Sequence, residues 1–301
     1  MTTSANRTTE KKRRNVAAVT AAAILFLAGG AAADDDELIA KGRYLLHAGG
    51  CISCHKGDED DAHPLAGGHA LESPFGTFYS PNITPDPETG IGNWTDEDFL
   101  RAFWEGENPE GDHYFPSFPY TAYTGMSRED VLALKAYLFS VEPVRKENKE
   151  HDLWAIMSSR FAAGVWKARY FDAARFEPDP QQNDEWNRGA YLVRHLGHCG
   201  ECHTPRSSLG ALDEDREFAG NPELTDDESA PNITPHRENG IGRWSVGDIE
   251  YFLEIGMLPD GDFTGSSMVD VIEDNTSHLT REDRLAIAAY LKSLPPHEDQ
   301  D

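Results

Sequence analysis

The sequence predicts an all-α protein built from two tandem copies of one small domain. The motif Cys-x-x-Cys-His occurs at residues 51–55 and again at 199–203, and together the copies use all four cysteines of the 301-residue chain. The segments around each motif recur in the same order, with apolar residues at helical spacing. We therefore expect a leader at residues 1–33, one domain at 34–143, a connector at 144–183 and a second domain at 184–301.

The N-terminus reads as an export signal. Four basic residues at 11–14 precede an apolar stretch at about 16–27, and the run Ala31-Ala32-Ala33 precedes three aspartates. This pattern predicts a secretory signal peptide that is cleaved after Ala33, which places the protein in the periplasm. The alternative is an uncleaved anchor and a membrane-associated protein, although the stretch is shorter than the ~18 apolar residues that favour a span.

Each copy is expected to contain three helices. The first precedes the cysteine motif, at about 37–47 and 184–196. The second opens at Thr95 or Ser245, where an acid three places later predicts a capping box. The third opens at Ser127 or Thr280, and its apolar side chains recur at helical spacing. The connector contains many aromatic residues, so we expect it to pack across the seam between the domains rather than to act as a flexible linker.

Motifs outside the helices confirm the duplication. Pro-Asn-Ile-Thr-Pro at 81–85 recurs at 231–235, and Gly-Ile-Gly-x-Trp at 90–94 recurs at 240–244. The offset between copies is 148 at the cysteines, 150 at these two motifs and 153 in the last helix. Such a small drift requires only short insertions. The asparagine and threonine of the first motif are expected to fix a loop, and the tryptophans to pack in the core.

The cysteine motif has the spacing of covalent haem attachment. Two thiols three positions apart can each add to one vinyl group of the porphyrin, and the following histidine is then held under the iron. A zinc ribbon needs its cysteine pairs roughly 15–20 residues apart, and a thioredoxin-like pair leaves both histidines unexplained. We predict two covalently bound haem c groups. Their attachment residues are Cys51, Cys54, Cys199 and Cys202, and their proximal iron ligands are His55 and His203.

Small helices around a covalently fixed haem are the architecture of class I cytochrome c. The two copies, with the stretches at 185–192 and 197–206, resemble the cytochrome c subunit of membrane-bound alcohol and gluconate dehydrogenases. This resemblance implies tandem class I cytochrome c domains and a dehydrogenase as partner. Those subunits usually carry three haem domains, whereas this sequence ends after the second. We therefore expect a dihaem relative.

The sixth iron ligands differ between the copies. In the family, the loop before the last helix supplies a methionine, which in the second copy is Met268, with Met257 as a weaker candidate. The corresponding residue of the first copy is Phe118, which cannot bind iron. Three interpretations stay open there: Met126, which also matches Leu279 as a hydrophobic staple; His113; or no sixth ligand. The other histidines of the chain are expected on the surface or in loops.

The charge and the motifs restrict the function. The net charge of −26 becomes about −30 without residues 1–33, which excludes nucleic acid as a partner. The acids are spread along the chain and identify no partner. We expect an electron carrier between a periplasmic dehydrogenase and a cytochrome, quinone or oxidase, rather than a stand-alone enzyme, and we predict no catalytic residue. The alternative is a dihaem oxidoreductase, similar to a thiosulfate dehydrogenase or a peroxidase, with the first haem as substrate site.

Overall fold

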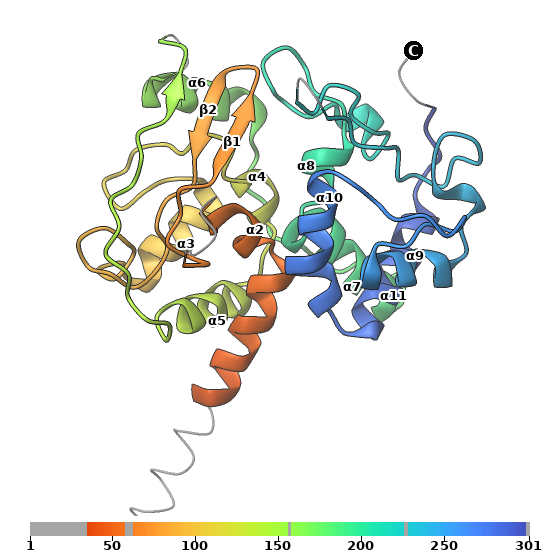
Figure 1. Cartoon of the computed structure of the whole chain (residues 1–301), viewed down its shortest axis with the longest axis horizontal. Coiled ribbons are helices and arrows are strands. Elements are labelled where there is room, and N and C mark those ends of the chain that lie inside the picture. Colours follow the sequence, from red (N-terminus) through yellow and green to blue (C-terminus); the bar gives the residue numbers. More distant parts are fainter. Residues whose placement is uncertain (1–34, 58–62, 156–157, 226–227, 299–301) are drawn as a thin grey trace, which may run out of the picture.

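The chain forms two mostly helical halves that lie side by side (Figure 1). The computed structural model describes residues 35–57, 63–155, 158–225 and 228–298. We call residues 35–143 the first half and residues 184–298 the second half. The predicted signal peptide lies outside the described residues. Within those four ranges, no helix has both the length and the apolar character needed to cross a membrane.

The first half contains the three predicted helices. A helix at residues 35–48 leads into α2 (Cys51–His55), followed by α3 (Asp96–Glu105), α4 (Tyr120–Tyr123) and α5 (Arg128–Leu138). The predicted capping box of α3 is present, since the Thr95 hydroxyl accepts from Asp98 N at 3.2 Å and the Asp98 carboxylate accepts from Thr95 N at 3.1 Å. Gly106, at φ 63°, ends α3.

The second half repeats this order with additional turns. Its elements are α7 (Asp184–Tyr191), η1 (Leu192–Leu196), α8 (Gly200–His203), η2 (Glu214–Arg216), η3 (Ile241–Arg243), α9 (Val246–Ile255), α10 (Ser267–Asp270), η4 (Val271–Asn275), η5 (Thr276–His278) and α11 (Arg281–Ser293). The π-helix η1 accounts for one insertion. The offset between the halves is 147 at Gly42 and Gly189 but 148 at the cysteines, and a π-turn absorbs one extra residue within a helix.

A small antiparallel sheet accompanies the first half, and the prediction of an all-α fold did not include it. Its strands are β1 (Ala70–Ser73), β2 (Gly76–Tyr79) and β3 (Asp152–Leu153), in that order across the sheet. Strands of two to four residues contain too few alternating positions to give a period-2 pattern. The third strand comes from the connector, so that the pairing of β2 with β3 depends on the tertiary fold.

The first and last helices of each half cross with their backbones in contact. A Cβ atom added to Gly42 would lie 1.9 Å from the Ala133 carbonyl oxygen on α5. A Cβ added to Gly189 would lie 2.0 Å from the Ala286 carbonyl oxygen on α11. Only glycine permits this approach, which explains why it recurs at the same place in both copies.

The halves bind each other through reciprocal contacts. The Tyr44 hydroxyl of the first half donates to Asp283 of the second half at 2.5 Å. The equivalent Tyr191 hydroxyl of the second half donates to Asp130 of the first half at 2.6 Å. Equivalent tyrosines of the two halves therefore each bond to the opposite half, so that the repeated sequence forms both sides of the interface.

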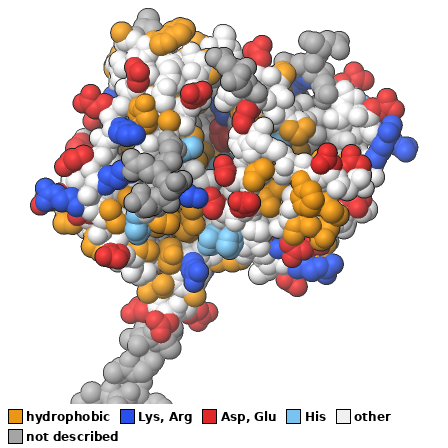
Figure 2. Space-filling view, viewed as in Figure 1, with side chains coloured by type: hydrophobic (Ala, Val, Ile, Leu, Met, Phe, Trp, Pro, Cys, Tyr) orange, Lys and Arg blue, Asp and Glu red, His pale blue; other side chains and the backbone are white. Residues whose placement is uncertain are grey.

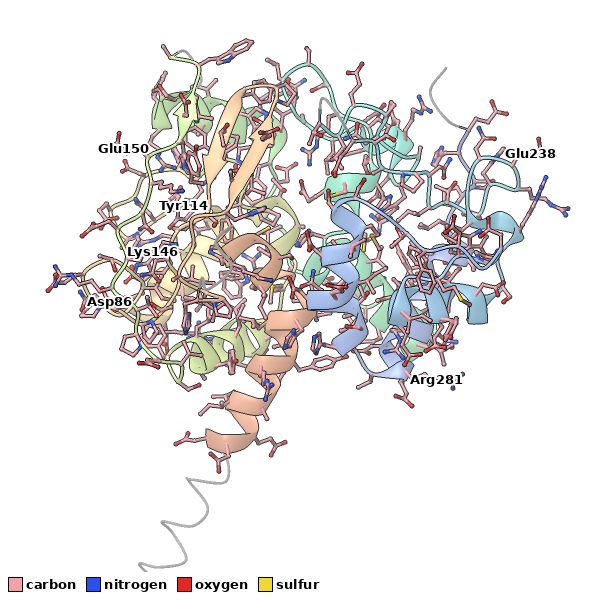
Figure 3. The ribbon with its side chains drawn as sticks, viewed as in Figure 1. Asp86, Tyr114, Lys146, Glu150, Glu238 and Arg281 are labelled. Atoms are coloured by element: carbon pink, nitrogen blue, oxygen red, sulfur yellow. The ribbon has the colours of Figure 1, made fainter. Side chains whose placement is uncertain are left out.

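The connector contacts both halves. The Arg175 guanidinium lies 4.0 Å from the Trp104 ring in the first half, and the Phe176 ring lies 5.5 Å from Tyr191 in the second. This part of the connector packs across the seam, as expected. Its helix α6 (Arg160–Tyr170) instead leaves Phe161 80 % exposed. Lys146, labelled in Figure 3, donates to the Gly67 carbonyl oxygen at 2.8 Å and fastens the start of the connector to the first half.

Candidate functional site

The four thiols lie at two short helices: Cys51 and Cys54 belong to α2, Cys199 is the N-cap residue of α8, and Cys202 lies within α8. All four are free, and in each pair the three-residue spacing puts both sulfurs on one side of a helical turn. Burial raises the pKa of Cys51 to about 12, that of Cys54 to about 11 and that of Cys199 to about 12. A thioredoxin-like pair needs the opposite shift, because its attacking thiol has a lowered pKa. The described residues also contain no group of three or more His, Cys, Asp or Glu side chains placed to hold a metal ion.

Both motif histidines are oriented by a proline carbonyl. His55 Nδ1 lies 2.7 Å from Pro81 O, and His203 Nδ1 lies 2.7 Å from Pro231 O. A carbonyl only accepts, so Nδ1 carries the hydrogen and Nε2 keeps the lone pair that a metal requires. Burial lowers the pKa of His55 to about 4 and also lowers that of His203, which keeps both rings neutral. The sequence contains the repeated proline, but its spacing gave no sign of this role.

The loop that carries each proline is fixed by the next residue. Asn82 is 2 % exposed, and its Oδ1 accepts from the N–H and the hydroxyl of Thr84 at 2.9 and 2.8 Å. Asn232 is 4 % exposed, and its Oδ1 accepts from Thr234 in the same way at 2.8 and 2.7 Å. Asn82 Nδ2 also donates to Val144 O at 2.7 Å. These contacts confirm the expected loop-fixing role. The donor set therefore fits covalent haem: free thiols at vinyl spacing beside a neutral, oriented imidazole.

The candidate sixth ligands lie in different environments. Met268 is partly exposed at the start of α10. Met126 is 0 % exposed and belongs to the hydrophobic core, and its carbonyl accepts from Trp104 Nε1 at 3.0 Å. This is the packing position that Leu279 occupies in the second half. His113 Nδ1 lies 3.3 Å from Glu107 and faces α6 at Gly164. Met126 and His113 as ligands both stay predictions.

Aromatic rings surround Phe118, which matches Met268. Its ring centroid lies 5.5 Å from Phe103, 5.4 Å from Tyr114 and 5.6 Å from Tyr123. Tyr114, labelled in Figure 3, belongs to the first half, and burial holds its pKa well above the ordinary value. The loop around Phe118 is thus an aromatic cluster, and the sequence pattern did not predict that Tyr114 and Tyr123 belong to it.

Each motif also contacts the opposite half. Ser53, within the first motif, accepts from Asn275 Nδ2 at 3.2 Å. Glu201, the equivalent residue of the second motif, accepts from the Thr121 hydroxyl at 2.9 Å. His198 lies in a loop between η1 and α8, as expected, where it is half-buried and its Nε2 lies 3.3 Å from Gly49 O of the first half. Burial lowers the pKa of His198, so its imidazole is neutral.

The acidic side chains on the face drawn in Figure 2 are dispersed. Figure 2 shows Asp and Glu scattered over the visible face, with Lys and Arg between them. Several carboxylates are paired, among them Asp283 with Arg188 at 2.6 Å and Glu217 with Arg194 at 2.6 Å. On this face, side chains of both charges are therefore interspersed.

Several known proteins are similar to this chain over most of its length. The sequence model of the family described as cytochrome c matches residues 39–142. The chain is 44 % identical over 263 residues to a diheme cytochrome c-type protein of Cereibacter sphaeroides, and the match covers 86 % of each chain. It is 40 % identical over 269 residues to the gluconate 2-dehydrogenase cytochrome c subunit of Pantoea cypripedii. It is 38 % identical over 266 residues to the cytochrome c subunit of the quinone-type alcohol dehydrogenase of Gluconobacter oxydans.

The last two matches cover 85 % and 86 % of this chain but only 59 % and 55 % of those subunits. The match with the diheme protein covers most of both chains and agrees with the duplicated thiol and histidine geometry. The chain belongs to the cytochrome c family and binds haem c covalently.

Proposed function

We propose that this protein is a dihaem electron carrier in which residues 34–143 and 184–301 are two cytochrome c domains. The observation that carries the proposal is the repeated pair of histidine–proline contacts, at 2.7 Å in both halves. The same ligand geometry has been built twice, which a single haem does not require. Covalently bound haem supplies one-electron exchange at its iron, without a substrate pocket.

In this proposal Cys51, Cys54, Cys199 and Cys202 attach the two haems, and His55 and His203 are the proximal ligands. The protein's own residues orient these ligands. Pro81 and Pro231 hold the imidazoles through Nδ1, and the asparagine after each proline keeps the loop in place. A hydrogen bond to Nδ1 also makes Nε2 a stronger ligand.

Met268 is the proposed sixth ligand of the second haem, and its thioether raises the reduction potential. For the first haem, Met126 is the only methionine of the first half, so that it stays the methionine candidate. Its complete burial weighs against it, because a ligand must present its sulfur to the haem face. His113 is also directed elsewhere, because its Nδ1 lies 3.3 Å from Glu107 and its ring packs against α6 at Gly164.

The electron donor in this proposal is a periplasmic dehydrogenase, and the acceptor is a downstream cytochrome, a quinone or an oxidase. Support comes from the names of the relatives, which include cytochrome subunits of gluconate, alcohol and fructose dehydrogenases. Export through the signal peptide at 1–33 places the protein in the periplasm, with peripheral association at the membrane surface.

The test is haem content and reduction. The exported protein is expected to carry two haems per chain, and Cys51→Ala with Cys54→Ala, or Cys199→Ala with Cys202→Ala, is expected to leave one. The wild-type protein is then mixed with sugar and alcohol dehydrogenases and their substrates, and haem reduction is followed by absorbance. A chain that carries one haem, or that no dehydrogenase reduces, contradicts the proposal.

A second candidate is a dihaem oxidoreductase whose first haem meets the substrate. The observation that favours it is the aromatic residue Phe118 at the Met268 position, together with the burial of Met126. A high-spin ferric signal from the first haem, carbon monoxide binding and turnover of thiosulfate or peroxide are expected in that case. Two low-spin haems that do not bind carbon monoxide exclude it.

A further inference from the structure

His198 has a left-handed backbone conformation, and the equivalent residue of the first half is a glycine. Its φ is 38°, in the left-handed region, and the equivalent residue of the first half is Gly50, at φ 66°. Non-glycine residues are uncommon in this region because Cβ crowds the backbone. Such a conformation persists only where the surroundings hold it, and it is concentrated at functional sites. We therefore ask which contacts hold the His198 side chain in this conformation.

The His198 side chain crosses to the other half and reaches the turn that precedes the first motif. Its Nε2 lies 3.3 Å from Gly49 O, and the carbonyl also accepts from the Tyr123 hydroxyl at 2.6 Å. Because the carbonyl only accepts, Nε2 carries the hydrogen. The rings of His198 and Tyr123 meet edge to face, with centroids 5.4 Å apart. His198 directly precedes Cys199, and Gly49 lies two residues before Cys51, so one hydrogen bond links the two motifs.

The surrounding contacts show that the motifs face each other. Ser53 and Glu201, at the same position in the two motifs, each bond to the opposite half. A Cβ added to Gly197 would lie 3.6 Å from Ala48 O and 3.8 Å from Cys199 Sγ. The turns before the two motifs are thus packed together.

We propose that His198 is a positioning residue that couples the two haem-attachment sites. Its hydrogen bond to Gly49 holds the turns before Cys51 and Cys199 together. With haem attached at both motifs, this contact would couple the two sites for the exchange of one electron, one iron being oxidised as the other is reduced. The inference rests on the proposed function, because the coupling matters only where both motifs carry redox-active haem.

The experiment uses the full-length dihaem protein. His198→Asn keeps a residue that tolerates the left-handed backbone but is too short to reach Gly49, and His198→Gly restores the residue of the first half. His195→Ala is the matched control, since His195 Nδ1 also bonds across the halves, to Ala122 O at 3.0 Å, without contacting Gly49. The rate of electron exchange between the haems is measured after flash reduction, together with both midpoint potentials and the melting temperature.

We expect inter-haem exchange to slow several-fold in both His198 variants and to keep its wild-type rate in His195→Ala, with unchanged haem spectra and melting temperatures. A wild-type rate in the His198 variants overturns the inference, as does an equal loss in His195→Ala, which would mean a general loosening of the interface. If neither His198 variant folds, Tyr123→Phe leaves His198 as the remaining side-chain donor to Gly49 O, so the wild-type rate is expected there. A several-fold loss in Tyr123→Phe would assign the coupling to Tyr123 and overturn the inference. Exchange between the haems in a wild-type protein that no dehydrogenase reduces would contradict the proposed function alone.

Discussion

At the scale of single residues, the state of each haem ligand depends on a neighbour. The motif histidine follows directly from the sequence, but its tautomer depends on a carbonyl 26 residues away in the first half. Asn82 fixes the loop that presents this carbonyl. A buried amide with several hydrogen-bond partners is costly to remove, because those partners then lose their bonds.

We therefore expect Asn82→Ala to lower the free energy of unfolding by about 2–3 kcal/mol, since it leaves the buried Thr84 N–H without its partner and removes one of the two donors to the Val144 carbonyl. Chemical denaturation of the holoprotein measures this change. Asn93 is exposed and donates only to Pro87 O, so that Asn93→Ala is the control and is expected to have little effect. Equal losses in both variants would contradict a special role for Asn82.

The two methionines are expected to respond differently to leucine. Met268→Leu removes the proposed thioether ligand, so the potential of one haem should fall and its visible spectrum should change. Met126→Leu replaces a fully buried side chain by one of similar volume, so a packing role predicts an unchanged spectrum and a stability change below about 1.5 kcal/mol. A spectral change in Met126→Leu would instead identify Met126 as the first haem's ligand.

At the scale of elements, the helices depend on close backbone contact as much as on their apolar faces. Gly42 and Gly189 occupy the points where the first helix of each half meets the last. Helix propensity by itself favours alanine over glycine at such positions. The tertiary contact reverses this preference, because the added Cβ has no space.

Gly42→Ala and Gly189→Ala are each expected to destabilise the holoprotein by about 1–3 kcal/mol through overpacking. The control is Gly247→Ala in α9, where the nearest atom to an added Cβ is the Ser245 hydroxyl at 3.7 Å. This control is expected to be neutral or stabilising. Thermal unfolding followed by circular dichroism compares the three variants, and a stabilised Gly42→Ala would show that the helices do not meet as described.

At the scale of the whole molecule, the two halves form one unit through reciprocal tyrosine–aspartate bonds. Burial alone would raise the pKa of Asp283, but hydrogen bonds from Arg188 and Tyr44 outweigh it and hold this pKa below its ordinary value. A carboxyl with a lowered folded pKa contributes stability above its unfolded pKa of about 3.9, and that stability is lost as pH falls through the folded pKa.

Acid is therefore expected to weaken the contact between the halves. The wild-type protein should lose stability below about pH 4, and Asp283→Asn should remove part of this dependence. The double variant Tyr44→Phe with Tyr191→Phe should separate one unfolding transition into two, because both cross-half bonds to Asp130 and Asp283 are lost. Calorimetry at neutral and acidic pH measures both effects. A single transition in the double variant would mean that other contacts hold the halves together.

The sequence by itself determined the features that depend on neighbouring residues. Helix caps, helical periodicity and the thiol–thiol–histidine spacing each lie within a few residues, and the duplication repeats them. Those features predicted the helices and the haem chemistry. The small sheet escaped prediction because its strands are too short to give a pattern.

Only the tertiary structure decided which distant groups meet. It brought Pro81 O to His55, enclosed Met126 in the core and carried His198 to Gly49, 149 residues away. Each of these contacts joins segments whose local sequence is compatible with several surroundings. Their physical basis is packing between segments that are distant along the chain, within one half for His55 and Pro81 and between the halves for His198 and Gly49, and no local sequence pattern predicts such packing.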